Sequence, residues 1–134
     1  MLPALLAAVL SIMIYLITTL SRRGPSFVPE DIPDLSDKTI LITGGNSGIG
    51  YQTAKELLLK GATVYLSARS RKKAAEAIEK LERETKRTAK FLELDLADLR
   101  SVRGAATEFL KQESSLNVFF NNGKVGHSFG IDYG

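Results

Sequence analysis

Glycines recur through the segment from Thr43 to Gly50, and these residues are the best suited in the sequence to ligand chemistry. A phosphate group needs backbone N–H donors with little side-chain bulk beside them, and glycine meets this need while also allowing positive φ. The first N–H groups of the helix expected next are unpaired and carry a partial positive charge. We therefore predict a diphosphate site in which Gly44 makes the turn, Gly48 lets the backbone approach the phosphates and Gly50 lets the helix pack on the preceding strand.

The same turn carries two polar side chains, Asn46 and Ser47, which can add hydrogen bonds to a phosphate. A glycine turn is a weak signal by itself. Here it follows an expected strand and opens an expected helix within an alternating unit, which is the context of a dinucleotide-binding site. We therefore predict a dinucleotide cofactor, and a glycine-rich turn without a ligand is the weaker alternative.

The end of the second expected strand indicates which dinucleotide the turn would bind. Proteins that bind NAD usually place an acidic residue there, where it binds the ribose 2′-hydroxyl. This sequence instead has Ser67-Ala68-Arg69-Ser70, without an acid. An arginine would pair with a 2′-phosphate through charge-assisted hydrogen bonds. We therefore predict that Arg69 favours NADP, and NAD is the less favoured cofactor.

Short apolar runs alternate with helical patterns downstream of the linker. The apolar runs predict strands at 38–43, 63–67, 91–94 and 117–120. The helical patterns predict helices at 50–60, 71–87 and 99–111. Such alternation implies parallel strands joined by right-handed crossovers. The predicted fold class is α/β, a partial Rossmann fold with a doubly wound parallel sheet of about four strands, preceded by one N-terminal transmembrane helix.

Residues 2–20 contain no charged side chain and are mostly Leu, Ile, Ala, Val and Met. As a helix this run would be about 28 Å long, close to the thickness of the hydrocarbon core of a bilayer. A cleaved signal peptide is a weaker alternative, because the run lacks a basic start and an Ala-x-Ala site. A core helix is weaker still, because the run has no polar stripe. We predict a transmembrane anchor whose partner is the lipid bilayer.

Arg22 and Arg23 follow this apolar run directly. The positive-inside rule then predicts a single-pass protein whose folded part faces the cytosol, with the endoplasmic reticulum as the expected membrane. Three of the four prolines fall in residues 21–37, which indicates a linker. The predicted organisation is therefore an anchor (2–20), a linker (21–37), an NAD(P)-binding half-domain (38–125) and an irregular tail (126–134).

Composition excludes several other functions. The 134-residue chain has no cysteine and one histidine, His127, so we predict no disulfide and no metal site. The net charge is only +3, and the Lys and Arg residues are mixed with Glu, which argues against a nucleic-acid partner. The run Arg71-Lys72-Lys73 is either a solvated helix start, which we favour, or a patch for acidic partners. Whether the chain forms a homo-oligomer is left open.

The motifs described above resemble the short-chain dehydrogenase/reductase family of the classical type. Thr43, Gly44, Gly48, Ile49 and Gly50 match its Thr-Gly-x-x-x-Gly-x-Gly turn. The resemblance implies an NAD(P)-dependent oxidoreductase that interconverts an alcohol and a carbonyl, and it adds Ile49 to the predicted cofactor site.

Three further matches lie downstream. Asp95 and Leu96 match an Asp-Leu/Val pair whose carboxylate contacts the adenine ring in the family. Asn121 and Asn122 match the start of an Asn-Asn-Ala-Gly motif that steadies the sheet and lines the cofactor, which implies that Gly123 also belongs to the site. Some relatives place a basic residue toward the 2′-phosphate at the position of Lys73. With an N-terminal anchor, the pattern is similar to retinol-dehydrogenase-like members.

The chain departs from the family pattern in two ways. Lys124 stands where the Asn-Asn-Ala-Gly motif has its glycine. The family's catalytic Ser and its Tyr-x-x-x-Lys pair, which lie further along, have no counterpart in these 134 residues. Tyr51 and Lys55 have the spacing of that pair, but they lie on the helix that begins at the diphosphate, so we interpret the spacing as chance.

We therefore predict no catalytic residues. The expected function is that of the NADP-binding portion of a membrane-anchored, C-terminally truncated short-chain dehydrogenase/reductase, inactive alone. The alternatives are a non-catalytic dinucleotide-binding fragment and an unstable truncated product, because half a sheet buries little surface.

Overall fold

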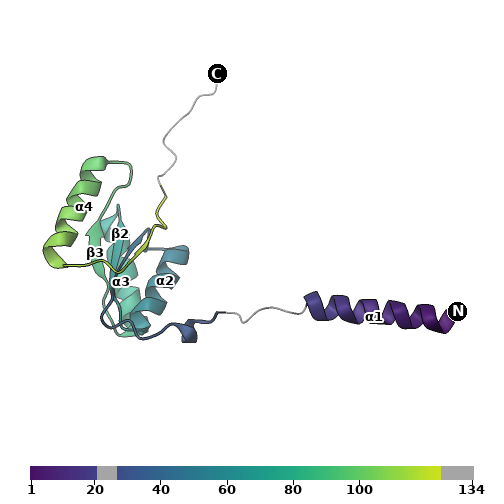
Figure 1. The fold of residues 1–134 in the computed structure, drawn as a ribbon. Coiled ribbons are helices and arrows are strands. Elements are labelled where there is room, and N and C mark those ends of the chain that lie inside the picture. The colour runs from purple at the N-terminus through teal and green to yellow at the C-terminus, as the bar shows by residue number, and fades with distance from the viewer. Residues whose placement is uncertain (21–26, 125–134) are drawn as a thin grey trace, which may run out of the picture. The chain divides into compact units, whose positions relative to one another are not determined.

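The computed structural model describes residues 1–20 and 27–124 (Figure 1). The chain divides into two units, Met1–Asp31 and Ile32–Gly134. The predicted irregular tail (126–134) with His127, and the arginines predicted to set membrane orientation, lie outside the described residues.

The first unit contains α1 (Leu2–Leu20) and the short 3-10 helix η1 (Pro29–Asp31). A helix thus forms where the apolar run predicts one. No helix in the described part of the chain is long and apolar enough to cross a membrane, however, so the prediction that residues 2–20 are a transmembrane anchor is not supported. The bilayer partner and the cytosol-facing position remain predictions.

The second unit is a four-stranded parallel sheet in the order β3-β2-β1-β4. Its elements, in chain order, are β1 (Thr39–Thr43), α2 (Gly48–Leu59), β2 (Thr63–Ala68), α3 (Arg71–Thr85), β3 (Lys90–Glu93), α4 (Leu99–Gln112) and β4 (Val118–Phe120). The prediction of a Rossmann-like α/β unit with about four parallel strands is confirmed, and the element boundaries differ from prediction by one or two residues.

Alternating side chains of the strands point to opposite faces of the sheet and enter two separate cores. On one face, Ile40, Ile42 and Leu66 pack with residues of α2 and α3. On the other face, Tyr65 packs with α4, its ring 5.0 Å from that of Phe109 in an edge-to-face pair. Figure 1 accordingly shows α4 on the opposite side of the sheet from α2. Helices therefore pack on both faces of the sheet, as is usual for central parallel strands.

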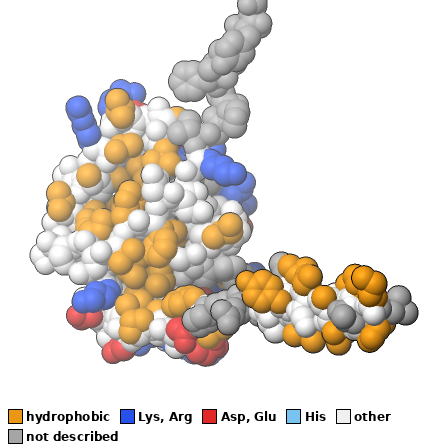
Figure 2. All heavy atoms as spheres, turned by 45° about the vertical axis from the view of Figure 1, so that its right-hand side comes forward, with side chains coloured by type: hydrophobic (Ala, Val, Ile, Leu, Met, Phe, Trp, Pro, Cys, Tyr) orange, Lys and Arg blue, Asp and Glu red, His pale blue; other side chains and the backbone are white. Residues whose placement is uncertain are grey.

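The face that carries α4 is only partly covered. An apolar groove of about 390 Å³ runs between α4 and the sheet. Its lining includes Leu41 on β1, Leu110 on α4 and Phe119 on β4. All three residues of β4 are exposed, from 37% for Phe120 to 52% for Phe119. Figure 2 shows apolar side chains exposed across one face of this unit. Among the described residues, β4 thus forms an exposed apolar edge of the sheet.

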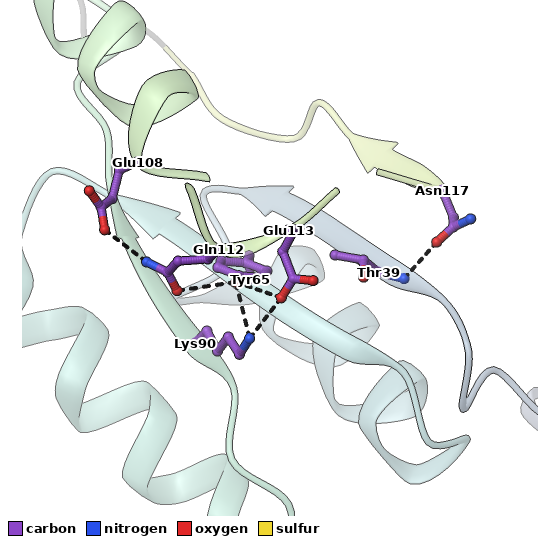
Figure 3. A network of polar contacts seen from close by, with 7 residues as sticks. All are labelled: Thr39, Tyr65, Lys90, Glu108, Gln112, Glu113 and Asn117. Carbon is purple, nitrogen blue, oxygen red and sulfur yellow. Dashed lines mark hydrogen bonds and ion pairs between the residues drawn. The ribbon is translucent and has the colours of Figure 1, made fainter. Parts of the chain in front are cut away.

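A polar network connects the C-terminal end of α4 to the sheet (Figure 3). The buried Tyr65 hydroxyl donates a hydrogen bond to Glu113 Oε1 at 2.8 Å and accepts one from Lys90 Nζ at 3.1 Å. Lys90 Nζ also lies 2.7 Å from Glu113 Oε1. The hydrogen bonds from Lys90 and Tyr65 hold the pKa of the Glu113 carboxyl below its usual value. One carboxylate thus ties together β2, β3 and the end of α4.

We predict that Tyr65→Phe lowers the free energy of unfolding by about 1–2 kcal/mol, because it removes a buried hydroxyl that is hydrogen-bonded to both Glu113 and Lys90. The matched control is Tyr51→Phe, since the buried Tyr51 hydroxyl makes no hydrogen bond to residues 1–20 or 27–124. That variant should change stability by less than about 0.5 kcal/mol. Urea denaturation followed by circular dichroism measures both, and equal effects of the two substitutions would contradict the role of the network.

Candidate functional site

The glycine turn between β1 and α2 has the backbone geometry that the sequence predicts. Gly44 and Gly48 both have positive φ, +65° and +57°, in the left-handed region that favours glycine. Ser47 is the N-cap residue of α2, yet its side chain makes no capping hydrogen bond. The first N–H groups of α2 therefore lack a side-chain acceptor from the cap residue, which is the arrangement suited to binding an anion at a helix start.

The turn is packed against the residues that follow β4. A Cβ atom added to Gly44 would lie 3.1 Å from the Cα of Gly123, and one added to Gly50 would lie 2.5 Å from the carbonyl oxygen of Gly44. The contact at Gly50 is too close for a side chain. The contact at Gly44 is tight, and the positive φ of Gly44 favours glycine there in any case.

Three hydrogen bonds connect the ends of β1 and β4. The Thr43 hydroxyl donates to the Phe120 carbonyl at 3.3 Å and accepts from the Gly123 N–H at 2.8 Å. The Asn122 side-chain amide donates to the Gly44 carbonyl at 3.4 Å. Asn122 and Gly123 therefore brace the turn, which agrees with the steadying role that the sequence resemblance implies for them.

A cavity of about 230 Å³ opens at the carboxyl ends of the strands, directly beside this turn. Its lining comes from the ends of all four strands and the start of α3. The lining residues are Thr43, Gly44, Asn46, Ser67, Ala68, Arg69, Ser70, Lys73, Leu94, Leu96, Gly123 and Lys124. The fold thus brings together six residues of the predicted site, namely Gly44, Asn46, Arg69, Lys73, Leu96 and Gly123.

The other predicted residues lie elsewhere around the turn. Ser47, Gly48 and Ile49 line an adjoining open groove between α2 and α3, which Asn46 and Lys73 also line. Gly50 is buried beneath the turn. Asn121 is exposed and, like Asn122, is not part of the cavity lining.

Asp95 also stands apart from the cavity lining. Its carboxylate accepts a hydrogen bond from the Ala97 N–H at 2.9 Å, and its own N–H donates to the Ser101 hydroxyl at 2.9 Å. These bonds hold a tight turn between β3 and α4. The adenine contact implied for Asp95 by the resemblance stays a prediction.

Sequence reasoning missed several residues that line the cavity, notably Ser70, Leu94 and Lys124. A signal for them was available, because each of them lies at the end of a predicted parallel strand or a few residues beyond it. The carboxyl ends of parallel strands meet at one edge of a sheet, where ligands of this architecture bind.

The charges at the cavity are all of one sign. Arg69, Lys73 and Lys124 line it, and none of the described lining residues is acidic. The neighbouring Arg71 instead pairs with Glu93 at 2.9 Å and stacks over the ring of Phe91. Within this run, Arg71 is therefore held in an ion pair, whereas Lys73 lines the cavity. The positive charge of Lys73 is suited to binding a phosphate there.

Tyr51 and Lys55 are poorly placed for acid–base chemistry. Tyr51 is only 7% exposed, and burial together with the neighbouring Glu84 carboxylate raises the pKa of its phenol. A tyrosine that exchanges protons near neutral pH needs the opposite shift. Lys55 pairs with Glu84 at 2.9 Å. Within residues 1–20 and 27–124, no group of His, Cys, Asp and Glu side chains could hold a metal ion.

Comparison with known proteins gives concordant matches. A family model described as short chain dehydrogenase matches residues 38–131. A short-chain dehydrogenase/reductase of Armillaria gallica is 53% identical over 110 residues, which cover 82% of this chain and 36% of the relative. An oxidoreductase of Schizosaccharomyces pombe is 41% identical over 102 residues, which cover 75% of this chain and 30% of the relative. The chain thus spans about a third of the length of these curated relatives.

Solved structures match as well. A Shigella flexneri 2a protein complexed with NADP has a TM-score of 0.61 and 30% identity, over 69% of this chain and 40% of that chain. An Escherichia coli CFT073 protein complexed with NADPH has a TM-score of 0.62 and 30% identity, over the same shares of 69% and 40%.

We predict that Gly50→Ala lowers the free energy of unfolding by about 1–3 kcal/mol, because its methyl group would collide with the Gly44 carbonyl and move the turn. The control is Gly104→Ala in α4, where an added Cβ meets nothing within 4 Å. That variant should stabilise the protein by about 0.4–1 kcal/mol. Chemical denaturation measures both, and a neutral Gly50→Ala would contradict the packing described here.

Proposed function

The chain belongs to the short-chain dehydrogenase/reductase family, and from this premise we propose that its folded unit binds NADP at the carboxyl edge of the sheet. One observation carries the proposal: the glycine turn, Arg69 and Lys73 line the same cavity, and no acid in the described part of the chain lines it. The two solved relatives complexed with NADP and NADPH support the choice of cofactor.

Each part of the cavity fits one part of the cofactor. The turn and the start of α2 offer N–H donors and a positive helix end to the diphosphate. Arg69 and Lys73 offer charge-assisted hydrogen bonds to the 2′-phosphate. Leu94 and Leu96 give the cavity an apolar wall suited to the adenine ring. The dinucleotide, when bound, supplies hydride-transfer chemistry, and the protein binds and orients it.

We further propose that this chain is the cofactor-binding portion of an oxidoreductase acting on an alcohol or its carbonyl counterpart, as in the retinol-dehydrogenase-like members that the sequence resembles. Alone it would bind cofactor without turnover. The buried Tyr51, with its raised phenol pKa, and the paired Lys55 are the residues with the catalytic spacing, and neither is suited to the chemistry.

A non-catalytic dinucleotide-binding module is the second candidate function. The apolar groove beside Phe119 favours it, because contiguous exposed apolar surface often marks an interaction site. An unstable product is the third possibility. A cooperative melting transition of the purified chain would count against that last one.

We predict that Arg69→Asp weakens NADP binding at least about tenfold and leaves NAD binding within about threefold, because only NADP carries the 2′-phosphate. The control is Arg71→Asp, which makes the same charge change at a residue that pairs with Glu93 and does not line the cavity. Isothermal calorimetry with both cofactors gives the ratio of affinities. Equal losses for NADP and NAD in the Arg69 variant would contradict the assignment.

We also predict that the purified 134-residue chain binds NADPH without oxidising or reducing a panel of alcohols and carbonyls, including retinol and retinal. Absorbance at the nicotinamide band follows turnover, and calorimetry on the same sample follows binding. Measurable turnover would overturn the proposal of an inactive cofactor-binding portion.

A further inference from the structure

Lys124 is a cation at the cavity that the cofactor assignment above does not use. It follows Gly123 at the end of β4, it is exposed, and it lines the same cavity as Gly44 and Arg69. Within the described residues none of the ion pairs involves Lys124. Its ammonium group is thus present at the cavity without an ion-pair partner from those residues.

The strand order places Lys124 on one side of the glycine turn and Arg69 on the other. In the sequence of strands β2-β1-β4, Arg69 follows β2, the turn follows β1, and Lys124 follows β4. The backbone beside Lys124 touches the turn itself, because Gly123 Cα would lie 3.1 Å from a Cβ at Gly44. The backbone that carries Lys124 therefore borders the turn on the β4 side, and Arg69 follows the strand on its other side.

We propose that the Lys124 ammonium pairs with the diphosphate of the bound dinucleotide from the β4 side of the turn. This inference rests on the proposed function, since it presumes that the turn holds a dinucleotide. A lysine is suited to the role, because its flexible stem carries a compact point charge that can follow a phosphate oxygen. NAD and NADP share the diphosphate, so Lys124 raises affinity for both, whereas Arg69 and Lys73 select between them.

The test uses the full chain and four variants in isothermal calorimetry. Lys124→Gln should weaken binding of NADPH and NADH by the same factor, roughly five- to twentyfold at low salt. Lys124→Arg should retain most of the affinity. Lys111→Gln is the matched control, because it removes the same charge at a residue on α4 that pairs with Glu108, away from the cavity. The fourth variant, Arg69→Asp, should weaken the binding of NADPH and leave the binding of NADH unchanged.

Two further measurements sharpen the result. Adenosine 2′-phosphate lacks a diphosphate, so its binding should be unchanged in Lys124→Gln and weakened in Arg69→Asp. The difference in cofactor affinity between the unmodified chain and Lys124→Gln should decrease as the salt concentration rises, because salt screens the ion pair between Lys124 and the diphosphate. Thermal unfolding should be the same for the unmodified chain and Lys124→Gln, which checks that the fold is kept.

The other outcomes decide against the inference in distinct ways. Unchanged affinity for both cofactors in Lys124→Gln would mean that the ammonium is solvated. A loss for NADPH alone would place Lys124 at the 2′-phosphate instead. If the unmodified chain binds neither NADPH nor NADH, the proposed function itself fails, and this inference fails with it.

Discussion

The close approach of the first turn to the end of β4 is the constraint on which the site depends. An added Cβ would lie 3.1 Å from the Gly123 Cα at Gly44, 2.5 Å from the Gly44 carbonyl at Gly50 and 2.8 Å from the Leu96 side chain at Gly123. Because these backbones pack closely, the turn is fixed against the end of β4. Thr43 and Asn122 reinforce this contact with hydrogen bonds from both sides. A single extra methyl group would move the elements apart.

The parallel topology then distributes charge around that fixed turn. Each strand delivers its last residues to the same edge, so residues distant in sequence become neighbours there. β2 contributes Arg69, β3 leads to the apolar Leu96, and β4 leads to Lys124. The acidic residues near this edge are occupied otherwise: Glu93 pairs with Arg71, and Asp95 closes its own local turn. The cavity is therefore cationic and partly apolar, which matches a phosphorylated nucleotide.

The strands, the helices and the turn could be predicted because they depend on local patterns. Apolar runs, helical spacing and glycine placement act over a few residues, and the structure keeps them with small shifts at the ends. Asp95 has a local role that its spacing did not predict, because its carboxylate accepts a hydrogen bond from the Ala97 N–H. The shape of the cavity and its separation from the adjoining groove between α2 and α3 depend on which elements pack together, and no local pattern contains that information. For residues 2–20 the apolar run predicted a helix correctly, but a bilayer-spanning role did not follow from it.

The thin attachment of β4 has a consequence for the thermodynamics of the site. This strand has three residues, all of them exposed, and among the described strands it pairs only with β1. Local opening of such a strand costs less free energy than opening of the buried strands. Yet Gly123, which follows it, is one wall of the cavity and one support of the turn. Pairing of β4 with β1 and formation of the site are therefore linked equilibria. A ligand that binds across the turn and the end of β4 would also stabilise the pairing of β4 with β1.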